Sequence, residues 1–381
     1  MEKRLFTSEC VTCGHPDKVA DSISDAILDA CLQQDPGSRV ACETMGTTDF
    51  CVICGEITTK AEVNYEAVAR DVIRKIGYTN PGDGFDADSV QILCKIHTQS
   101  ADIAMGTNDE VGGAGDQGMM FGGACTQTPE LMPLPVALSR ALSNRLTLCV
   151  QSNDLLRPDG KTQVSVEYDE DGNVVGIDTV VVSIMHSADF EIGEVRRYVR
   201  EGVIAPVLKH YGFDIADVAN IHINPTGNFV IGGPNGDTGL TGRKIIVDTY
   251  GGYFSHGGGA FSGKDPTKVD RSGAYMARYM AKNVVAAGLA DNVQVQLAYA
   301  IGVAEPVSVR VETYGTGKIA DEKMTELLRQ VCDLTPGGII RKLQLRRPIY
   351  APTAAEGHFG VADRPWEQTD IAEELKKLAE I

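Results

Sequence analysis

A secondary-structure order that recurs three times along the chain is the strongest constraint on its fold. In the first third, alternating apolar residues indicate strands, and apolar residues three or four apart indicate helices. This third follows the order β-α-β-β-α-β, with strands at 4–11, 39–44, 50–58 and 89–96 and helices at 16–34 and 64–76. Such an order is a split β-α-β unit, in which helices cover a small sheet.

The other two thirds of the chain repeat this order. The second copy has predicted strands at 119–125, 163–168, 174–185 and 220–224 and helices at 133–150 and 192–211. The third has predicted strands at 243–249, 293–302, 307–314 and 338–345 and helices at 266–287 and 321–332. We therefore predict an α+β protein of three related β-α-β-β-α-β domains, at residues 1–112, 113–232 and 233–381. The first range ends in the start of a glycine-rich lid loop spanning 99–123, and the last ends in a tail helix at 370–378.

The charge balance limits the partners of this protein. Lys and Arg number 35 against 52 Asp and Glu, which gives a formal net charge of −17. Such a surface repels nucleic acid and anionic membranes, so neither is expected as a partner. No apolar run approaches the ~20 residues of a membrane helix, and the first ten residues lack the apolar core of a signal peptide. We expect a cytoplasmic protein in which any nucleotide site needs a local basic cluster or metal ions.

The ten cysteines leave a zinc-binding module open as an alternative. Two pairs have the C-x-x-C spacing of zinc ligands, Cys10 with Cys13 and Cys51 with Cys54. The second pair lies in a predicted strand, where residues three apart face opposite sides, so the two thiols do not converge on one ion. Buried free cysteine is also a common small hydrophobe.

Two glycine patterns resemble nucleotide-binding motifs. Gly113-x-Gly115-x-x-Gly118 matches the dinucleotide fingerprint, but no strand precedes it, which argues against a Rossmann site. The segment from Gly258 to Lys264 nearly matches a P-loop and leaves a nucleotide phosphotransferase as a second alternative. Asp265 stands where a P-loop needs Ser or Thr for Mg²⁺, which argues against it. The glycine loop and helix start can still bind phosphate through backbone N–H groups.

Acidic and basic residues beside these loops predict a polyphosphate site. Asp17 and Asp270 each lie in the first turn of a predicted helix, and carboxylates of this kind suit Mg²⁺. Asp25 and Asp29 follow Asp17 at four-residue steps with Asp21 and are expected on a solvated acidic face. The basic residues next to glycine turns are Lys161, Arg243, Lys244, Lys264 and Lys268. As a group they meet the need for a local basic cluster in an acidic protein.

Several segments resemble the methionine adenosyltransferase family, which joins methionine to ATP to make S-adenosylmethionine. They are Gly14-His15-Pro16-Asp17-Lys18, Gly113-Ala114-Gly115-Asp116-Gln117-Gly118 and Gly257-Gly258-Gly259-Ala260-Phe261-Ser262-Gly263-Lys264-Asp265, and similar segments recur along nearly the whole chain. The resemblance implies three domains around a pseudo-threefold axis. It also implies a homo-oligomer, a dimer or a dimer of dimers, with the active site at the dimer interface. The implied cofactors are Mg²⁺, two per site, and K⁺.

The resemblance also assigns site residues. The implied catalytic residues are His15, Lys161, Arg243, Lys244, Lys264 and Asp116. The implied ATP-binding residues are His15, Asp159, Lys161, Asn228, Phe229, Asp237, Arg243, Lys244, Ala260 and Lys264. Methionine would contact Glu56, Gln99, Asp237 and Lys268, while Asp17 and Asp270 would hold Mg²⁺ and Glu43 would hold K⁺. The sequence departs from the family pattern at Cys13, Met105 and Asn228.

The implied reaction is displacement at the ribose C5′ of ATP by the methionine sulfur. A thioether is already nucleophilic, so no general base is needed, and no Ser/His/Asp signature is present. The basic residues and Mg²⁺ would stabilise the leaving triphosphate, which the family then hydrolyses to pyrophosphate and phosphate.

Overall fold

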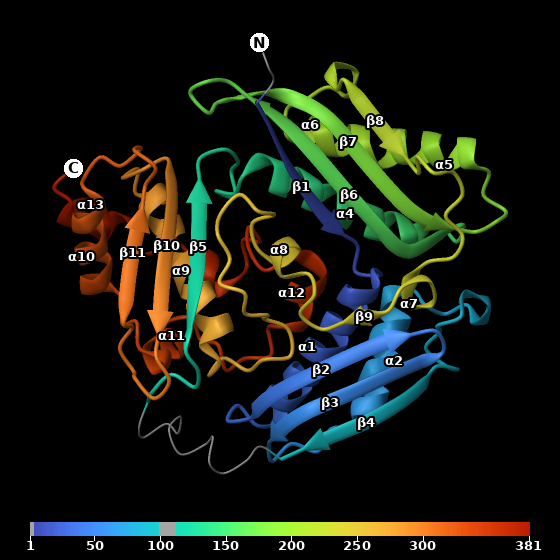
Figure 1. Ribbon diagram of the computed structural model, residues 1–381, viewed down its shortest axis with the longest axis horizontal. Helices are drawn as coiled ribbons and strands as arrows, with labels where there is room; N and C mark the ends of the chain where they lie inside the picture. The colour runs from blue at the N-terminus through green and yellow to red at the C-terminus, as the bar shows by residue number, and fades with distance from the viewer. Residues whose placement is uncertain (1–3, 99–111) are drawn as a thin grey trace.

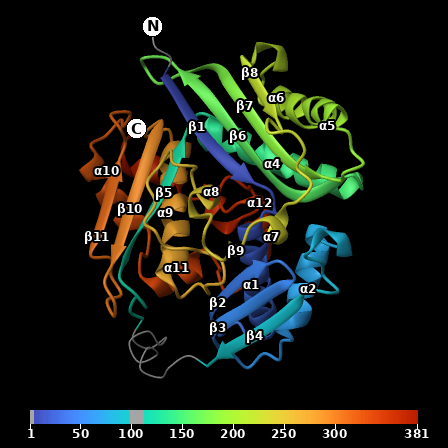
Figure 2. The ribbon, with the colours of Figure 1, turned by 45° about the vertical axis from the view of Figure 1, so that its right-hand side comes forward.

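The computed structural model describes residues 4–98 and 112–381, and within those ranges the strands form three small sheets. The sheets surround a central region of loops and short helices, and longer helices lie behind each sheet (Figure 1). Turning the molecule shows α4, α5 and α6 together on one side of the sheet that contains β6 and β7, and α1 and α2 behind β2, β3 and β4 (Figure 2). The fold is therefore α+β, as predicted.

The first two thirds follow the predicted order of elements. The first contains β1 (Arg4–Val11), α1 (Pro16–Gln34), β2 (Arg39–Thr47), β3 (Phe50–Thr58), α2 (Tyr65–Ile76) and β4 (Gln91–His97). The second contains β5 (Gly118–Cys125), α4 (Leu134–Ser152), β6 (Leu156–Tyr168), β7 (Val174–His186), α5 (Ile192–Val199), α6 (Ala205–His210) and β8 (Asn220–Ile223). A five-residue π-helical stretch joins α5 to α6. The helix predicted at 192–211 is therefore observed as one unbroken helical segment over residues 192–210.

The last third departs from the prediction at two strands. It contains α7 (Gly233–Gly236), β9 (Gly239–Leu240), α8 (Ile245–Asp248), α9 (Val269–Ala286), β10 (Asn292–Tyr299), β11 (Ser308–Glu312), α10 (Asp321–Val331), α11 (Pro336–Lys342), α12 (Ala351–Glu356) and α13 (Ala372–Leu378). The predicted strands at 243–249 and 338–345 were wrong, because these segments form α8 and α11. Thr335 caps α11 by accepting from the N–H of Gly338, and Pro336 suits its first turn.

Strand exchange connects the thirds of the chain. The sheet orders are β1-β6-β7-β8, β11-β10-β5 and β4-β3-β2-β9. Thus β1 pairs antiparallel with β6, β5 pairs with β10, and β9 pairs with β2. Each sheet takes one strand from a distant part of the sequence, and the segment after that strand is carried into a neighbouring unit. The domain boundaries at 112/113 and 232/233 stay a prediction.

Asp25 of α1 is buried and Asp29 is partly buried, so the predicted solvated acidic face was wrong. Asp25 is 0% exposed and pairs with Arg271, also 0% exposed, at 2.6 Å between Oδ1 and Nη1. Asp29 accepts backbone hydrogen bonds from Tyr350 and Ala351, at 3.0 and 2.8 Å. The helix is packed between the first and last units, so its charged side chains serve as internal ties.

The cysteines and the hydropathy pattern add two findings. All ten cysteines lie in the described ranges as free thiols, and Cys10 and Cys51 belong to different sheets. Cys51 is buried on β3 whereas Cys54 is partly exposed, as expected for residues three apart on a strand. Among the described helices, none has both the length and the apolar character needed to cross a lipid bilayer.

Candidate active site

The turn between β1 and α1 presents His15 in a fixed orientation. His15 is the N-cap of α1, and its Nδ1 accepts a hydrogen bond from the N–H of Asp17 at 3.2 Å. Because Nδ1 is the acceptor, the ring proton of the neutral side chain lies on Nε2. The hydroxyl of Tyr78 donates to Gly14 O at 2.5 Å, and a Cβ on Gly14 would lie 2.3 Å from Cβ of Pro158. Only glycine allows this close approach.

The carboxylate of Asp17 gathers the basic residues of the loop that follows β9. Its Oδ2 accepts a hydrogen bond from Lys244 Nζ, and its Oδ1 accepts one from the N–H of Leu240 at 2.9 Å. Arg243 Nε lies 4.0 Å from Oδ1, and His15 Nδ1 lies 4.0 Å from Oδ2. Burial alone would raise the pKa of Asp17, but the hydrogen bonds from Lys244 and Leu240 outweigh it and lower the pKa below its usual value.

The exchanged pairing of β1 with β6 brings Asp159 and Lys161 to the same turn. Lys161 is the register partner of Val11, the last residue of β1. Asp159 Oδ2 accepts from the N–H of Gly233 at 2.8 Å, and burial raises the pKa of Asp159 to about 6. A Cβ on Gly232 would lie 2.7 Å from the ring of Phe229 and 3.1 Å from Asp159 Oδ2. The aromatic ring and the carboxylate therefore flank one glycine turn.

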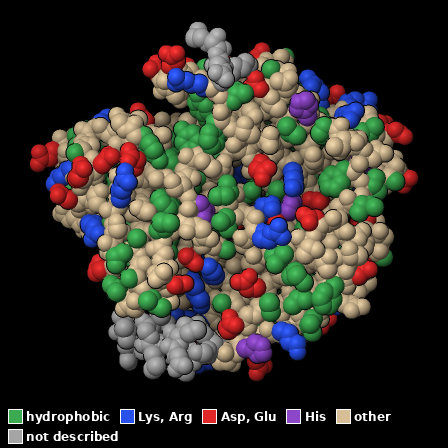
Figure 3. All heavy atoms as spheres, viewed as in Figure 1, with side chains coloured by type: hydrophobic (Ala, Val, Ile, Leu, Met, Phe, Trp, Pro, Cys, Tyr) green, Lys and Arg blue, Asp and Glu red, His purple; other side chains and the backbone are tan. Residues whose placement is uncertain are grey.

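The first cluster comprises His15, Asp17, Lys161, Arg243 and Lys244, and it keeps His15 uncharged at neutral pH. Burial and the positive charges of Lys244 and Lys161 lower the pKa of His15 to about 3. In the space-filling view, basic, acidic and histidine side chains gather near the end of β1 and the start of α7 and β9 (Figure 3). The cluster can therefore offer a neutral ring N–H and several cations to one anion.

A second cluster forms where the glycine loop meets α9. Lys264 Nζ lies 2.6 Å from Oδ2 of Asp270 in the first turn of α9. The glycines are required here: a Cβ on Gly257 would lie 1.6 Å from Met119 O, and one on Gly259 would lie 2.4 Å from Oδ1 of Asp270. The loop thus passes directly over the carboxylate of Asp270 because it has no side chains there.

The residue that breaks the P-loop pattern has a structural task. Asp265 is 0% exposed, and its Oδ2 accepts from the N–H of Val40 at 2.7 Å and from Lys268 Nζ. Its Oδ1 accepts from the N–H of Thr267 at 3.0 Å. Asp265 therefore anchors the glycine loop to β2 and holds Lys268, and both of its oxygens are committed to these contacts.

The two clusters are joined through β2 and through neighbouring loops. Lys264 forms an isolated antiparallel bridge with Ala41 of β2. A Cβ on Gly242, in the loop of the first cluster, would lie 2.6 Å from Cβ of Ala260 in the glycine loop. On the exposed face of the same sheet, Ala41 of β2 pairs with Glu56 of β3, and Glu43 lies two residues after Ala41 on β2. Glu43, Glu56 and Lys264 therefore share a sheet face by register.

Other predicted site residues stand apart or lie outside the described residues. Asp116 is exposed in the bend before β5, and its Oδ1 accepts from the N–H of Gln117 at 2.7 Å. Asn228 and Asp237 are exposed beside the first cluster, and the charge of Asp237 helps to raise the pKa of Asp159. Gln99, Met105 and residues 99–111 of the predicted lid lie outside the described residues.

Comparison with known protein families accounts for nearly the whole chain. Family models described as the S-adenosylmethionine synthetase N-terminal, central and C-terminal domains match residues 3–101, 111–229 and 231–368. The chain belongs to the S-adenosylmethionine synthetase family. It is an ATP:L-methionine S-adenosyltransferase. The three successive domain matches argue against both alternatives, the zinc-binding module and the P-loop phosphotransferase.

The described residues of this synthetase fit Mg²⁺ better than K⁺. Asp17 and Asp270 are hard oxygen ligands that each hold a lysine ammonium, and the loop at Gly259 passes close to Oδ1 of Asp270. Mg²⁺ commonly takes one or two carboxylates plus phosphate oxygens, so two such acids suffice. Within residues 4–98 and 112–381, no three His, Cys, Asp or Glu side chains converge as a metal site. Glu43 supplies a single exposed carboxylate for K⁺, and the described residues add no second His, Cys, Asp or Glu pair that would complete a metal site around it.

The sequence reading missed a buried ionic network beneath the first cluster. Lys18 Nζ lies 2.6 Å from Asp248 Oδ1 and 3.1 Å from Asp21 Oδ2. Asp21 also accepts from the N–H of Gly242 at 2.8 Å, and burial raises the pKa of Asp21 to about 7. The signal was present, because Lys18 and Asp21 are three apart on a helix, but its partner Asp248 lies 230 residues further along the chain.

Proposed function

We propose that the first cluster binds the triphosphate of ATP while the methionine sulfur attacks the ribose C5′. The C5′–O bond breaks, its electron pair leaves with the triphosphate, and the sulfur becomes a sulfonium. The observation that carries this proposal is the grouping of His15, Arg243 and Lys244 around Asp17, with Lys161 close enough to lower the pKa of His15, in a chain of net charge −17. Cations placed where charge develops stabilise the leaving group, at about 3 kcal/mol for one preorganised donor.

His15 is proposed to donate a hydrogen bond from Nε2 to the leaving oxygen. Its Nδ1 is occupied by the N–H of Asp17, and its pKa of about 3 keeps it neutral. A neutral donor does not need to lose a proton when it aids a leaving oxyanion. The reaction therefore does not require a titrating base from this residue, which agrees with the nucleophilicity of a thioether.

Lys264 and Asp270 are proposed to act on the same triphosphate from the second cluster. Asp17 and Asp270 would hold Mg²⁺, which would supply positive charge to neutralise the phosphate oxygens. Lys244 and Lys264, which pair with these acids, would then contact phosphate. The same residues would serve the hydrolysis of triphosphate to pyrophosphate and phosphate.

The remaining roles are proposed from the sites that flank the clusters. Asp159, Phe229, Asn228 and Ala260 would contact the nucleotide, and Asp116 would join the catalytic residues. Glu56, Gln99, Asp237 and Lys268 would contact methionine, and Glu43 would contribute to a K⁺ site. Glu56 lies on the sheet face that Lys264 shares, which supports a methionine site next to the phosphate tail.

The protein is proposed to act as a homo-oligomer, a dimer or a dimer of dimers, with the active site at the dimer interface. Large apolar side chains are exposed on strands of each sheet: Leu5 on β1 at 47%, Leu93 on β4 at 43% and Met119 on β5 at 48%. A second copy packed over these strands would remove the exposed apolar side chains from water. A second copy over the sheets would also bring its clusters to those of the first. ATP and methionine as substrates support a cytoplasmic location.

The decisive experiment is incubation with ATP, methionine, Mg²⁺ and K⁺ followed by mass spectrometry of the products. The proposal requires adenosylated methionine together with equal amounts of pyrophosphate and phosphate. Accumulation of ADP without a sulfonium product would contradict it. The oligomer is checked separately by sedimentation, and a strictly monomeric, fully active protein would contradict the shared site.

A further inference from the structure

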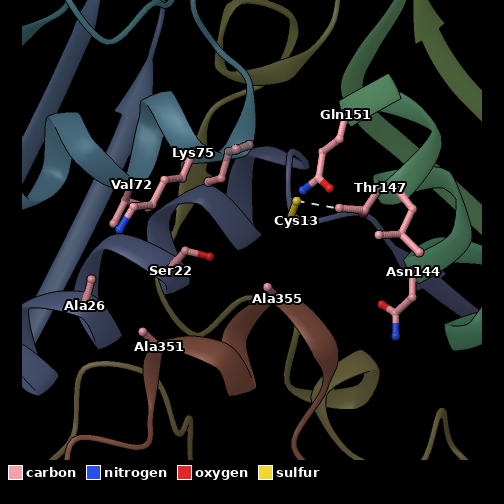
Figure 4. A pocket seen from close by; sticks show the side chains of 12 residues that line it. Cys13, Ser22, Ala26, Val72, Lys75, Asn144, Thr147, Gln151, Ala351 and Ala355 are labelled. Carbon is pink, nitrogen blue, oxygen red and sulfur yellow. Dashed lines mark hydrogen bonds between the residues drawn. The ribbon is translucent and has the colours of Figure 1, made fainter. Parts of the chain in front are cut away.

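A cavity of about 510 Å³ lies between helices α1, α2, α4 and α12 (Figure 4). Small-molecule sites commonly have volumes of about 300–1,000 Å³ and lie where domains meet. The four helices come from all three matched domains, so an occupant would contact each of them. None of the residues proposed to bind ATP or methionine lines this cavity.

The lining combines an apolar body with a few polar groups. The apolar part is supplied by Val72, Ile76 and Leu148 and by small side chains such as Ala355 of α12. Figure 4 shows the β-carbons of Ala351 and Ala355 at the lower side of the cavity, below Ser22 and Cys13. Because alanines form that wall, the space is left open by short side chains.

The hydroxyl of Ser22 is the strongest sign that the cavity takes a ligand. Ser22 lines the cavity, is only 7% exposed, and its side chain points into the open space (Figure 4). Its Oγ has no hydrogen-bond partner among the described residues. Buried polar groups are nearly always paired, because an unpaired one loses its hydration without compensation. A ligand with a hydrogen-bonding group at its inner end would supply the missing partner.

The rim of the cavity adds a positive charge. Lys75 is exposed at the cavity, and no hydrogen bond or ion pair engages its ammonium group within residues 4–98 and 112–381. The amides of Asn144 and Gln151 lie on the α4 side. In a protein with a net charge of −17, an unpaired lysine beside an apolar cavity favours a ligand with one negative charge.

We propose that this cavity is a binding site for a monoanionic, mainly apolar small molecule with a hydrogen-bonding group at its inner end. The site is separate from that of ATP and methionine. It adjoins the catalytic turn through Cys13, which lines the cavity two residues before His15 and whose Sγ lies 3.8 Å from Thr147 Oγ1 on α4. An occupant therefore contacts α1, α4 and α12 together, beside the turn that holds His15.

A suitable probe is 8-anilinonaphthalene-1-sulfonate, an apolar ring system with one sulfonate and one N–H group. Titrated into the full-length protein, it is expected to show saturable binding with one site per chain by fluorescence. Ala355→Trp, which fills the cavity, is expected to weaken binding at least tenfold. The matched control is Ala219→Trp, at an exposed alanine outside the cavity, which is expected to leave binding unchanged.

Charge reversal gives a second test that does not depend on filling the cavity. Lys75→Glu is expected to weaken probe binding at least threefold, whereas Lys209→Glu, at an exposed lysine on α6, makes the same charge change without effect. Saturating ATP and methionine are expected not to displace the probe. Absence of saturable binding, displacement by the substrates, or equal binding by Lys75→Glu and Lys209→Glu would each overturn the proposal.

Discussion

Removing the carboxylate of Asp25 is expected to destabilise the protein far more than removing an exposed acid. Asp25 Oδ1 accepts from Arg271 Nη1 at 2.6 Å and from the N–H of Gly263 at 2.9 Å, and Oδ2 accepts from Nη2 at 2.9 Å. Asp25→Ala leaves the guanidinium of Arg271 buried and without its counter-ion. It also frees the N–H of Gly263, directly before Lys264, from its acceptor.

The magnitude follows from the burial of both partners. Breaking a buried ion pair by deleting one member costs about 3–5 kcal/mol. The lower half of that range applies, because Arg271 keeps hydrogen bonds to Phe261 O at 2.9 Å and to the hydroxyl of Tyr275 at 3.0 Å. With an unfolding entropy of about 2 cal/mol/K per residue, 381 residues give roughly 0.8 kcal/mol/K. The expected fall in Tm is therefore about 4–5 °C.

Differential scanning calorimetry of three variants tests this reasoning. The matched control is Asp71→Ala, because Asp71 pairs with Arg74 on the surface and its side chain is 66% exposed. That control is expected to move Tm by no more than about 1 °C. The double variant Asp25→Ala/Arg271→Met is expected to be more stable than Asp25→Ala, since it removes the stranded charge. A Tm for Asp25→Ala equal to that of the control would refute the account.

Two further outcomes are expected. Lys264→Ala should lower kcat/KM about 100-fold with a Tm change under about 2 °C, because Lys264 and Asp270 are both partly exposed, while Lys323→Ala on α10 should leave kinetics unchanged. Near-normal turnover would remove Lys264 from the site. Burial raises the pKa of Asp29 from 3.8 to about 6, so the folded state binds the proton more tightly than the unfolded state. Wild type should therefore gain about 2 kcal/mol over Asp29→Asn between pH 7 and pH 4.5, measured by urea unfolding.

Local patterns in the sequence predicted most elements of the fold. Helix α1 and strands β1 and β3 have the predicted bounds, because the apolar periodicity there coincides with a clear start or stop. The segments at 243–249 and 338–345 failed because runs of Ile and Val suit a strand as well as a short buried helix. The cap by Thr335 favours helix α11, and the contact of Lys244 with Asp17 fixes the residue before helix α8. The second is a tertiary contact, which a local pattern cannot show.

The sequence indicated which residues meet in two contacts of the candidate site, but not how these contacts are arranged. Glycine turns next to basic residues identified Lys244 and Lys264, and the structure holds each of them on an aspartate that was predicted as a metal ligand. Periodicity could not show that these pairs form two clusters, because their positions depend on which sheet each loop joins. Nor could spacing alone show that Asp25 is an internal tie, since its partner Arg271 lies 246 residues away.

The strand exchange carries a consequence for folding that can be tested on one unit. The core formed by α4, β6, β7, α5 and α6 is separate from the larger core of the rest of the chain. That unit still lacks an edge strand of its own, because β1 covers β6 over eight register pairs from Arg4 with Tyr168 to Val11 with Lys161. A fragment of residues 126–232 therefore exposes the edge of β6, and unpaired edges promote aggregation.

Supplying β1 should repair the fragment. Residues 4–13 joined by a flexible linker to residues 126–232 are expected to give a monomer with a cooperative thermal transition by circular dichroism. The control joins residues 118–125 instead, because β5 pairs with β10 and not with β6. Burial of the β6 edge requires the specific register of β1, so the control is expected to aggregate like the unmodified fragment. If both fusions melted cooperatively at the same temperature, any apolar strand would suffice, and the exchange would not specify how the units assemble.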